Sequence, residues 1–457
     1  MTSITSRHTL RSILENAGDL LSLATDLLRY CRSERETYER IKDEIRLSNL
    51  AEVFTGRAAE VFWQVRGERI PPALRQRLVA LTFSDEFCSL APVLRARSLA
   101  LGLDHAMGHR LTAAFRNRGQ VLIAANDPVP VCRPPWKGIF SRRIEISPDP
   151  QNSSPEPDRL PHLCLAPESL GPLQVAIDCL EIDQLGPLLD EESQVVATGL
   201  PNQSLSEFRS GRSAADTGKA FFPFAPGNGR VQRDRLLSIF HQARLAGVAV
   251  LVFPELCMDE ECSKALVEEF HRAPGSLRLL VLGSHHTCAE GEPRNESLAV
   301  VRGSPRLLRH WKYRPFLDTR QKIPEGIESS PRKLTVFLSE AWSFTLLICK
   351  DLLDTETRSL VEKLGVTLVL VPALTPKTSQ FEEYAGSLAQ SNQALVVVAN
   401  NPIFPQRRRV HSIFAVPRQT ATKKVLAIRR GNRIPGLCCY RLGNGRGWWV
   451  DCPAKVD

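Results

Sequence analysis

Apolar residues recur at helical spacing through the first part of the chain. In residues 9–31 they fall three and four positions apart, which predicts one amphipathic helix. We interpret its apolar stripe as core packing within its own domain, and a partner-binding or oligomerisation face is the less common alternative. Similar patterns predict further helices over 34–49, 51–66, 72–82 and 86–116 and a short strand at 121–125. Pro92 and Gly102 are expected to break the last helix, and the whole pattern predicts a mainly helical domain over 1–140.

Between residues 141 and 172 the composition changes to Pro, Ser and Asp, as in SPDPQNSSPEPD. Such a segment buries too little apolar area to order itself, and its prolines interrupt any regular element. We therefore predict a linker over 141–172, followed by a second domain over 173–457.

Beyond the linker, short apolar runs alternate with helical segments. The strand candidates are rich in β-branched residues and leucine and cover 173–180, 249–253, 277–283, 297–303, 333–338, 344–349, 366–373 and 394–401. Helices are expected over 231–246, 356–364 and 379–392. Residues 184–229 are expected to form a long, partly irregular insertion. Strands that are apolar on both faces need helices to cover their sheet, which predicts an α/β architecture.

Charge and cysteine usage narrow the class of protein. With 59 basic and 50 acidic residues in 457, the formal net charge is +9, a small and diffuse excess that leaves nucleic-acid contact undecided. The 12 cysteines include no Cys or Cys/His cluster at zinc spacing, which favours reduced thiols. Glu15, Asp19 and Asp26 argue against a signal peptide or membrane span at the start. We therefore expect a soluble, cytoplasmic protein.

Three polar residues stand at or near the ends of apolar runs, which is where α/β folds place reactive side chains. Glu255 follows such a run and Pro254, and a half-desolvated carboxylate there would have the raised pKa of a general base; an acid at the start of a helix is the alternative. Cys349 ends a run before an expected helix. Cysteine there is usually a small buried hydrophobe, but nearby backbone N–H groups would lower the thiol pKa and offer an oxyanion site. Lys312, among basic and aromatic residues, resembles a surface lysine when taken alone.

The order of these three residues and the residues beside them distinguish them from isolated polar positions. A Glu in FPEL, a Lys in KYRPF and a Cys in CKD, in this order, resemble the nitrilase superfamily of carbon–nitrogen hydrolases. The family's GS strand, Asn-initiated strand and Gly turn are matched by Gly283, Ser284, Asn295 and Gly303. After the cysteine, GVTLVLVPA and QALVVVANN are similar to two further family strands, and Glu356 matches the Glu of CxDxxxPE. The resemblance covers residues 173–440, the length of a full domain.

The resemblance implies a four-layer αββα sandwich and a division of labour among the site residues. Glu255 is implied as the base that deprotonates Cys349, whose thiolate attacks an amide or nitrile carbon and forms a thioester. Lys312 and the backbone N–H after the cysteine are implied to stabilise the oxyanion. A second Glu between the Lys and the Cys is also implied, and Glu325 is favoured over Glu328. The implied reaction needs neither a metal nor an organic cofactor.

The residues after the cysteine depart from the family pattern. Lys350 stands where the family often has Tyr or Trp, so a second cation would share the cleft with Lys312 unless it turns outward or meets an acidic substrate. Asp351 is expected to cap the following helix and to support the cleft. Leu353 and Thr355 replace the usual Arg and Pro. These departures indicate a divergent branch and leave the substrate undetermined.

The remaining polar features are weaker. His285 and His286 are candidate metal or cleft residues, but no acidic or Cys partner stands at ligand spacing, so we interpret them as loop residues near the site. The basic run 406–409 is interpreted as a solvated loop at the mouth of the substrate site rather than a phosphate site. The glycines near 443–447 precede no helix and predict no nucleotide site.

Two functions of different class fit the sequence. The first is an amidase-like or nitrilase-like hydrolase of a small-molecule amide or nitrile. The second is a binding or assembly module whose N-terminal domain recruits a protein or nucleic-acid partner, since similar nitrilase-like domains occur in bacteria fused to other modules, some of them in defence against phage. Retention of all three catalytic residue types favours the enzyme. The same resemblance implies at least a homodimer.

Overall fold

The computed structural model describes residues 2–42, 44–116, 119–131, 157–180, 194–212, 220–289, 291–318, 323–339, 342–391, 394–401, 411–416, 427–429, 436–442 and 446–451. The chain divides into two compact units. We call Met1–Arg133 with Ser147–Ser169 the helical unit, and Pro134–Ile146 with Leu170–Asp457 the sandwich unit. In the part of the chain that is described, no helix is long and apolar enough to cross a membrane.

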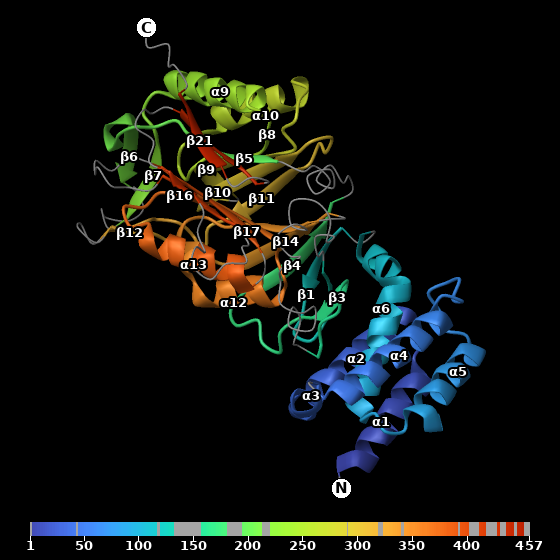
Figure 1. Cartoon of the computed structure of the whole chain (residues 1–457). Helices are drawn as coiled ribbons and strands as arrows, with labels where there is room; N and C mark the ends of the chain where they lie inside the picture. Colours follow the sequence, from blue (N-terminus) through green and yellow to red (C-terminus); the bar gives the residue numbers. More distant parts are fainter. Residues whose placement is uncertain are drawn as a thin grey trace. The chain divides into compact units, whose positions relative to one another are not determined.

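The helical unit is built around one long central helix. Its helices are α1 (Thr2–Asn16), α2 (Leu20–Ser33), α3 (Arg35–Ile41), α4 (Ile45–Phe62), α5 (Pro72–Thr82), the 3-10 turn η1 (Asp85–Phe87) and α6 (Pro92–Arg116) (Figure 1). Its short strands are β1 (Gln120–Ile123), β2 (Pro128–Pro130) and β3 (Leu163–Leu165), of which β2 and β3 pair antiparallel. Helices α2 and α4 both pack against α6. The mainly helical character predicted for this region therefore agrees with the structure.

The prediction of one helix over 9–31 is wrong. Helix α1 ends at Asn16 and α2 begins at Leu20, with Gly18 in the break. The Asp19 carboxylate caps α2 by accepting a hydrogen bond of 2.8 Å from the backbone N–H of Ser22. Apolar residues of the stripe on both sides of the break are buried, which confirms core packing. The stripe continues across the break, so its period alone does not reveal the cap.

The predicted interruption near Gly102 is also wrong, because α6 runs from Pro92 to Arg116. Pro92 begins the helix, where a proline removes no intrahelical hydrogen bond. A Cβ atom on Gly102 would lie 2.7 Å from Ala58 Cβ and 2.8 Å from the Thr55 carbonyl oxygen, both on α4. The glycine therefore lets α4 and α6 approach closely rather than ending α6.

Part of the segment predicted as a linker is folded, since β3 and the residues from 157 to 172 are ordered within it. Arg32 of α2 forms a 2.5 Å ion pair with Asp158 and donates to the carbonyl oxygens of Ala166 (2.8 Å) and Leu165 (3.2 Å). The Arg32 guanidinium thus satisfies carbonyl groups of this segment, whose residues Leu160, Leu163 and Leu165 are buried. Composition underestimates order here because these contacts come from a residue far along the chain.

Two sheets form the centre of the sandwich unit. One contains, in spatial order, β4 (Gln174–Cys179), β14 (Lys333–Leu338), β15 (Ser343–Leu346), β16 (Leu368–Ala373), β17 (Leu395–Asn400), β18 (Ser412–Ala415) and β19 (Ala427–Arg429). The other contains β11 (Leu307–Trp311), β10 (Glu292–Val301), β9 (Leu279–Ala289), β8 (Val248–Val252), β5 (Val195–Leu200), β20 (Gly436–Arg441) and β21 (Arg446–Asp451). The central strands β15, β16 and β17 are parallel in the first sheet, and β5, β8 and β9 in the second. Their carboxyl ends therefore lie along common edges.

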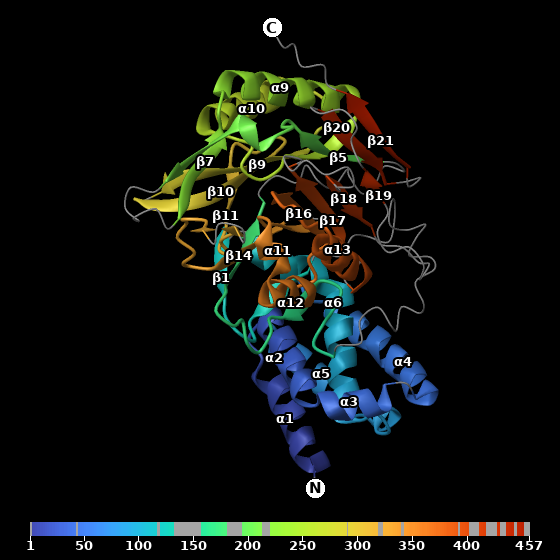
Figure 2. The ribbon, with the colours of Figure 1, turned by 90° about the vertical axis from the view of Figure 1, so that its left-hand side faces the viewer.

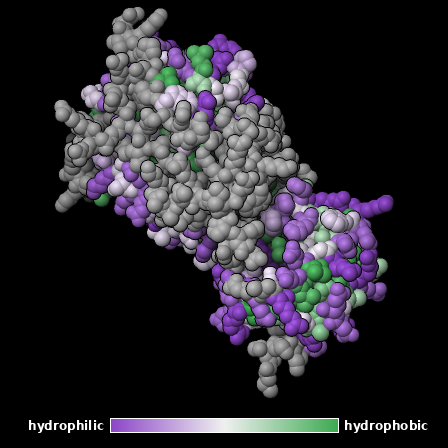
Figure 3. Space-filling view, viewed as in Figure 1, coloured by the Kyte–Doolittle hydropathy of each residue, from purple (hydrophilic) through white to green (hydrophobic). Residues whose placement is uncertain are grey.

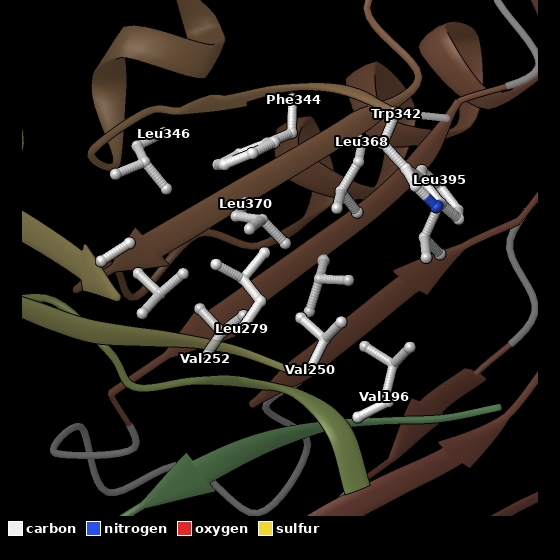
Figure 4. Packing of buried hydrophobic residues seen from close by; sticks show 14 of the residues in the cluster. Val196, Val250, Val252, Leu279, Trp342, Phe344, Leu346, Leu368, Leu370 and Leu395 are labelled. Carbon is white, nitrogen blue, oxygen red and sulfur yellow. The ribbon is translucent and has the colours of Figure 1, made fainter. Parts of the chain in front are cut away.

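The two sheets pack face to face and are covered by helices. Val250, Val252 and Leu279 of one sheet interdigitate with Phe344 and Leu370 of the other (Figure 4). Helices α9 (Gly229–Leu245) and α10 (Glu260–Arg272) bury their apolar faces on the outer side of the sheet that holds β8. Helices α12 (Thr355–Lys363) and α13 (Ser379–Ser391) lie on the other outer side, with the short α11 (Lys350–Leu353) beside them (Figure 2). The predicted four-layer αββα sandwich is confirmed.

The irregular insertion predicted over 184–229 is wrong in part. Strand β5 lies in the middle of its sheet, and the chain then forms the 3-10 turn η2 (Leu205–Glu207) and a hairpin of β6 (Phe208–Arg212) and β7 (Phe221–Pro226). Thr198 and Gly199 weaken the apolar pattern of β5, yet contacts with neighbouring residues require a hydroxyl at one position and the absence of a side chain at the other. The Thr198 hydroxyl lies 2.5 Å from that of Ser412 on the facing sheet. A Cβ atom on Gly199 would lie 2.5 Å from the ring of Phe253.

Hydrophilic side chains dominate the coloured surface of the face seen in Figure 3, with apolar side chains in small groups. Within the described ranges, the large apolar residues that are exposed are scattered: Val53, Trp63, Leu122, Leu205, Val231, Leu245, Leu307 and Leu317. Isolated apolar residues of this kind are usual on protein surfaces.

Candidate active site

The three residues singled out from the sequence lie in one buried region of the sandwich unit. Glu255 follows β8 and is 2% exposed, Lys312 directly follows β11 and is 1% exposed, and Cys349 lies between β15 and α11 and is 1% exposed. Backbone hydrogen bonds attach these positions to neighbouring strands. The N–H of Cys349 donates to the Pro372 carbonyl (2.8 Å), and the N–H of Lys312 donates to the Asn295 carbonyl (2.9 Å). Lys312 is therefore buried and is not the surface lysine that its basic neighbours suggest.

Lys312 joins two carboxylates. Its Nζ lies 2.6 Å from Oε1 of Glu255 and 2.6 Å from Oε2 of Glu325. Burial alone would lower the pKa of Lys312, but the charges of Glu255 and Glu325 outweigh burial and raise it. Glu328, the alternative second acid, instead accepts a hydrogen bond from the Ser330 backbone at 2.8 Å. The structure therefore brings Glu325, and not Glu328, to Lys312.

Glu325 is saturated with donors. Its Oε1 accepts from Asn295 Nδ2 (2.8 Å) and lies 2.9 Å from His286 Nε2, and its Oε2 accepts from Lys312 Nζ and the Phe316 backbone N–H (2.9 Å). Burial alone would raise the pKa of Glu325, but Lys312 and His286 outweigh it and hold that pKa far below the usual range. Glu325 is thus a permanent anion with no oxygen free to take a proton.

Glu255 differs from Glu325 both in the number of donors that it accepts from and in the direction of its pKa shift. Lys312 Nζ and Asn295 Nδ2 (3.1 Å) both donate to its Oε1, which leaves Oε2 open to another donor. Burial raises the pKa of Glu255, Lys312 opposes the rise, and the nearby charge of Glu325 adds to it. The Cys349 thiol lowers the pKa of this carboxylate slightly, which is a smaller effect than burial. Of the two carboxylates, Glu255 is therefore the one suited to accept a proton.

Cys349 occupies a strained turn. Strand β15 ends at Leu346, so the strand predicted over 344–349 is too long, and Cys349 stands at the N-cap position of α11 with φ 49° and ψ −105°. A non-glycine residue at positive φ stores strain that only surrounding contacts maintain. The turn aims Sγ toward the Leu374 carbonyl oxygen, 3.9 Å away.

The protonation state of Cys349 differs from the expectation. Burial raises the pKa of the thiol well above its usual value, and the Glu255 charge raises it further, whereas Lys312 opposes the rise. The low thiol pKa expected from nearby backbone N–H groups is therefore wrong. Helix α11 has only four residues, and its weak dipole does not offset removal of the thiolate from water. The resting thiol is neutral and needs a base.

Lys350 is half-buried beside the site. Its Nζ lies 5.4 Å from the centroid of the Phe316 ring, in a cation–π contact. Phe316 also donates its backbone N–H to Glu325, so this second cation borders the cluster that contains Lys312. Among the described residues, no carboxylate forms an ion pair with Lys350.

Asp351 is not the cap of α11, because Cys349 holds that position. It is fully buried and accepts four hydrogen bonds. The donors are His310 Nε2 (2.9 Å) and the backbone N–H groups of Tyr313 (3.3 Å), Arg314 (3.0 Å) and Ile348 (3.2 Å). Asp351 therefore connects the segment around Lys312 to the residue before Cys349. It supports the site as a buried acceptor between two segments, and not as a helix cap.

Sequence reasoning missed the part that two residues play in the site. Asn295 donates to both carboxylates, whereas the sequence indicates only a motif position for it. The prediction that His286 lies in a loop is wrong, because it lies in β9 with its side chain 1% exposed and contacts Glu325. The signal available was the alternation of an extended strand, which puts His286 on the same face as Ser284, whose hydroxyl accepts from the N–H after Glu255.

No group of three His, Cys, Asp or Glu side chains that could hold a metal ion occurs within the described ranges. The basic run 406–409 and the glycines 443–445 lie outside the described residues. The prediction that the reaction needs neither a metal nor an organic cofactor stays a prediction.

Comparison with known proteins gave matches to solved structures alone. No protein-family model and no curated protein sequence matches this chain. A cysteine-to-alanine mutant of the Nesterenkonia AN1 amidase from the nitrilase superfamily is 16% identical, covers 55% of this chain and 91% of its own, and has a TM-score of 0.40. Saccharomyces cerevisiae Nit3, of branch 10 of that superfamily, is 16% identical over 55% of this chain and 90% of its own, with a TM-score of 0.36. The glutamine-dependent NAD+ synthetase of Acinetobacter baumannii is 16% identical over 55% of this chain and 45% of its own, with a TM-score of 0.37. This chain is thus similar to solved members of the nitrilase superfamily, the family that its motifs resemble.

Proposed function

We propose that this protein hydrolyses a carbon–nitrogen bond, other than a peptide bond, in a small amide or nitrile through a thioester on Cys349. The observation that carries the proposal is the cluster in which Lys312 Nζ lies 2.6 Å from both Glu255 and Glu325, next to a thiol held on a strained turn. A buried lysine without a partner would cost much free energy of folding, and one carboxylate is enough to neutralise its charge. A purely structural role for Lys312 would therefore need only one carboxylate. The second carboxylate and the adjacent thiol fit a catalytic role.

Formation of the thioester begins with a proton transfer. Glu255 Oε2 takes the proton of the Cys349 thiol, and the thiolate attacks the amide carbon, so that a C–S bond forms and the carbonyl π electrons move to oxygen. Lys312 Nζ and the backbone N–H of Lys350 stabilise the resulting oxyanion. That N–H belongs to the first turn of α11, where helical geometry leaves it without an intrahelical acceptor.

Collapse of the tetrahedral intermediate expels the nitrogen. Glu255 returns its proton to the leaving amine or ammonia as the C–N bond breaks, which leaves the acyl group on Cys349. A water molecule that is deprotonated by Glu255 then attacks the thioester carbon, and the C–S bond breaks to regenerate the thiol and release a carboxylic acid. Glu325 stays ionised throughout because four donors hold it, and it keeps Lys312 charged and in place.

The test is ammonia release from a panel of small amides and nitriles, with intact-mass detection of an acyl adduct. Wild type is expected to turn over at least one compound, whereas Cys349→Ala releases none and Glu255→Gln is slowed by at least about a hundredfold. Cys439→Ala is the matched control, because Cys439 is an equally buried thiol in β20, away from the cluster. Ammonia release that persists in Cys349→Ala would refute the proposal.

The same experiment separates the enzyme from the alternative of a binding or assembly module. Such a module would show no turnover by wild type and no mass adduct on Cys349, while both Cys349→Ala and wild type stay folded by circular dichroism. Turnover that depends on Cys349 would exclude a purely non-enzymatic role for the sandwich unit.

A further inference from the structure

Both ring nitrogens of His286 are engaged in the core of the sandwich unit. The backbone N–H of Phe224 donates to Nδ1 at 2.9 Å, and Nε2 lies 2.9 Å from Oε1 of Glu325. A nitrogen that accepts from an amide carries no proton, so the ring proton is on Nε2. His286 is therefore a neutral imidazole of one defined tautomer, which donates to Glu325.

The hairpin of β6 and β7 holds His286 and Glu325 from the same side. Besides the bond from Phe224, the carbonyl of Phe221 accepts from the N–H of Gly326 at 3.1 Å, directly after Glu325. The ring of Phe222 stacks on the imidazole with 4.8 Å between centroids. The hairpin therefore fixes both the ring plane of His286 and the backbone that carries Glu325.

We propose that His286 is a positioning residue for the hydrolysis proposed above: as the Nε2–H tautomer, it orients Glu325 and couples the β6–β7 hairpin to the active site. This inference rests on the proposed function. The β6–β7 hairpin would then help to assemble the site. This hairpin lies within the segment that the sequence predicts to be an irregular insertion.

The physical consequence passes through Lys312. Without the Nε2 donor, Oε1 of Glu325 retains only Asn295, and the carboxylate can rotate about its last bond. Lys312 Nζ follows Glu325 Oε2, so its distance from the oxyanion changes while the substrate contacts stay the same. We expect His286→Ala to lower kcat by about 10–100-fold, the range for loss of one hydrogen bond to a charged group, with KM within about threefold of wild type.

Two conservative variants separate the two ring nitrogens. In His286→Gln the side-chain amide reaches the place of Nε2 and can donate to Glu325, so kcat is expected within about fivefold of wild type. In His286→Asn the amide oxygen reaches the place of Nδ1 and can accept from Phe224, but the donor to Glu325 is lost, so kcat is expected to fall as in the Ala variant. The control is His285→Gln on the same strand, whose side chain lies 3.9 Å from Glu296 and makes no contact with Glu325.

The experiment measures kcat, KM and the pH profile of these variants on an amide that wild type turns over, with melting temperatures as a check on folding. Rescue by His286→Gln together with an unchanged pH profile supports positioning, since a neutral donor exchanges no proton. Wild-type kcat in His286→Ala, or a His286→Gln variant as impaired as His286→Asn, would overturn the proposal. A lost limb of the pH profile in His286→Gln would overturn it too, in favour of acid–base catalysis. If wild type turns over nothing, the proposed function itself fails, and this inference fails with it for that separate reason.

A spectroscopic measurement tests the tautomer without any substrate. Nitrogen NMR of protein labelled at histidine is expected to show one imidazole with a protonated Nε2 and an unprotonated Nδ1, a signal that is absent in His286→Gln. A doubly protonated or Nδ1–H imidazole at this position at neutral pH would contradict the hydrogen-bond geometry on which the inference stands.

Discussion

Replacement of Asp351 offers a stringent test of how this site is held together. The side chain is fully buried, and it accepts hydrogen bonds from one imidazole and from three backbone N–H groups. The donors lie on two segments, one on both sides of Lys312 and one that precedes Cys349. The variant Asp351→Ala removes every acceptor at once, whereas Asp351→Asn keeps the shape and one oxygen.

The magnitude follows from the donors that lose a partner. Each buried N–H without an acceptor costs about 1–3 kcal/mol, so the three backbone groups together cost about 3–9 kcal/mol in Asp351→Ala. Domains are stable by only about 5–15 kcal/mol, and the Ala variant is therefore expected to be largely unfolded at 37 °C or to lose most of its cooperative transition. Water that enters the space left by the carboxylate would reduce the cost toward the lower figure.

The Asn variant distinguishes lost acceptors from lost charge. Its oxygen can still accept from Tyr313 and Arg314, while its amide nitrogen faces the N–H of Ile348 and Nε2 of His310. His310 can change tautomer and accept, so one backbone N–H remains unpaired and the cost falls to about 1–3 kcal/mol. Because that N–H precedes Cys349, its loss of a partner loosens the turn that buries the thiol, and faster alkylation by iodoacetamide is expected even where the fold survives.

The assay is urea unfolding followed by circular dichroism, combined with the rate of Cys349 alkylation by mass spectrometry. Asp354→Ala serves as the comparison. Asp354 caps α12 by accepting from the N–H (3.1 Å) and the hydroxyl (2.8 Å) of Thr357 and forms a half-buried ion pair with Arg314, so its loss is expected to cost about 1–2 kcal/mol. A free energy of unfolding for Asp351→Ala within about 0.5 kcal/mol of wild type would refute the reasoning, because surface-like substitutions have effects of that size.

Four further outcomes are expected. Burial raises the pKa of Glu255, so its ionised form is lost on acidification sooner than that of a free Glu, and turnover should fall as pH falls through this raised value; a profile flat down to pH of about 4 would contradict it. Lys350 forms no ion pair among the described residues, so it should favour amides that carry a carboxylate. Lys350→Gln should reduce the ratio of kcat/KM for acidic over neutral amides by about fivefold or more. An unchanged ratio would count against this role. Gly102→Val should destabilise the helical unit by about 1–3 kcal/mol through overlap with Ala58, and a melting temperature equal to wild type would exclude that packing. Light scattering should show at least a homodimer, and monomer alone would contradict the prediction.

Local pattern determined much of the sandwich unit. Apolar runs predicted strands where β4, β8, β14, β16 and β17 are found, since a strand buried on both faces has to be apolar along its length. The positions of Glu255, Lys312 and Cys349 after such runs were predicted by the same logic together with the family motifs. The pattern missed β5, because Thr198 and Gly199 are chosen for contacts with residues distant in the sequence.

Tertiary structure decided the chemistry of the same residues. The sequence by itself favoured Glu325 over Glu328 only through the resemblance, and only the fold brings Glu325 within 2.6 Å of Lys312. The thiol of Cys349 was expected to be acidic, yet burial beside Glu255 raises its pKa. Periodicity reports which face of an element is buried, whereas a pKa or a hydrogen bond depends on which distant group lies within a few ångströms. His286 shows the difference most clearly, since its tautomer is set by a backbone amide 62 positions away.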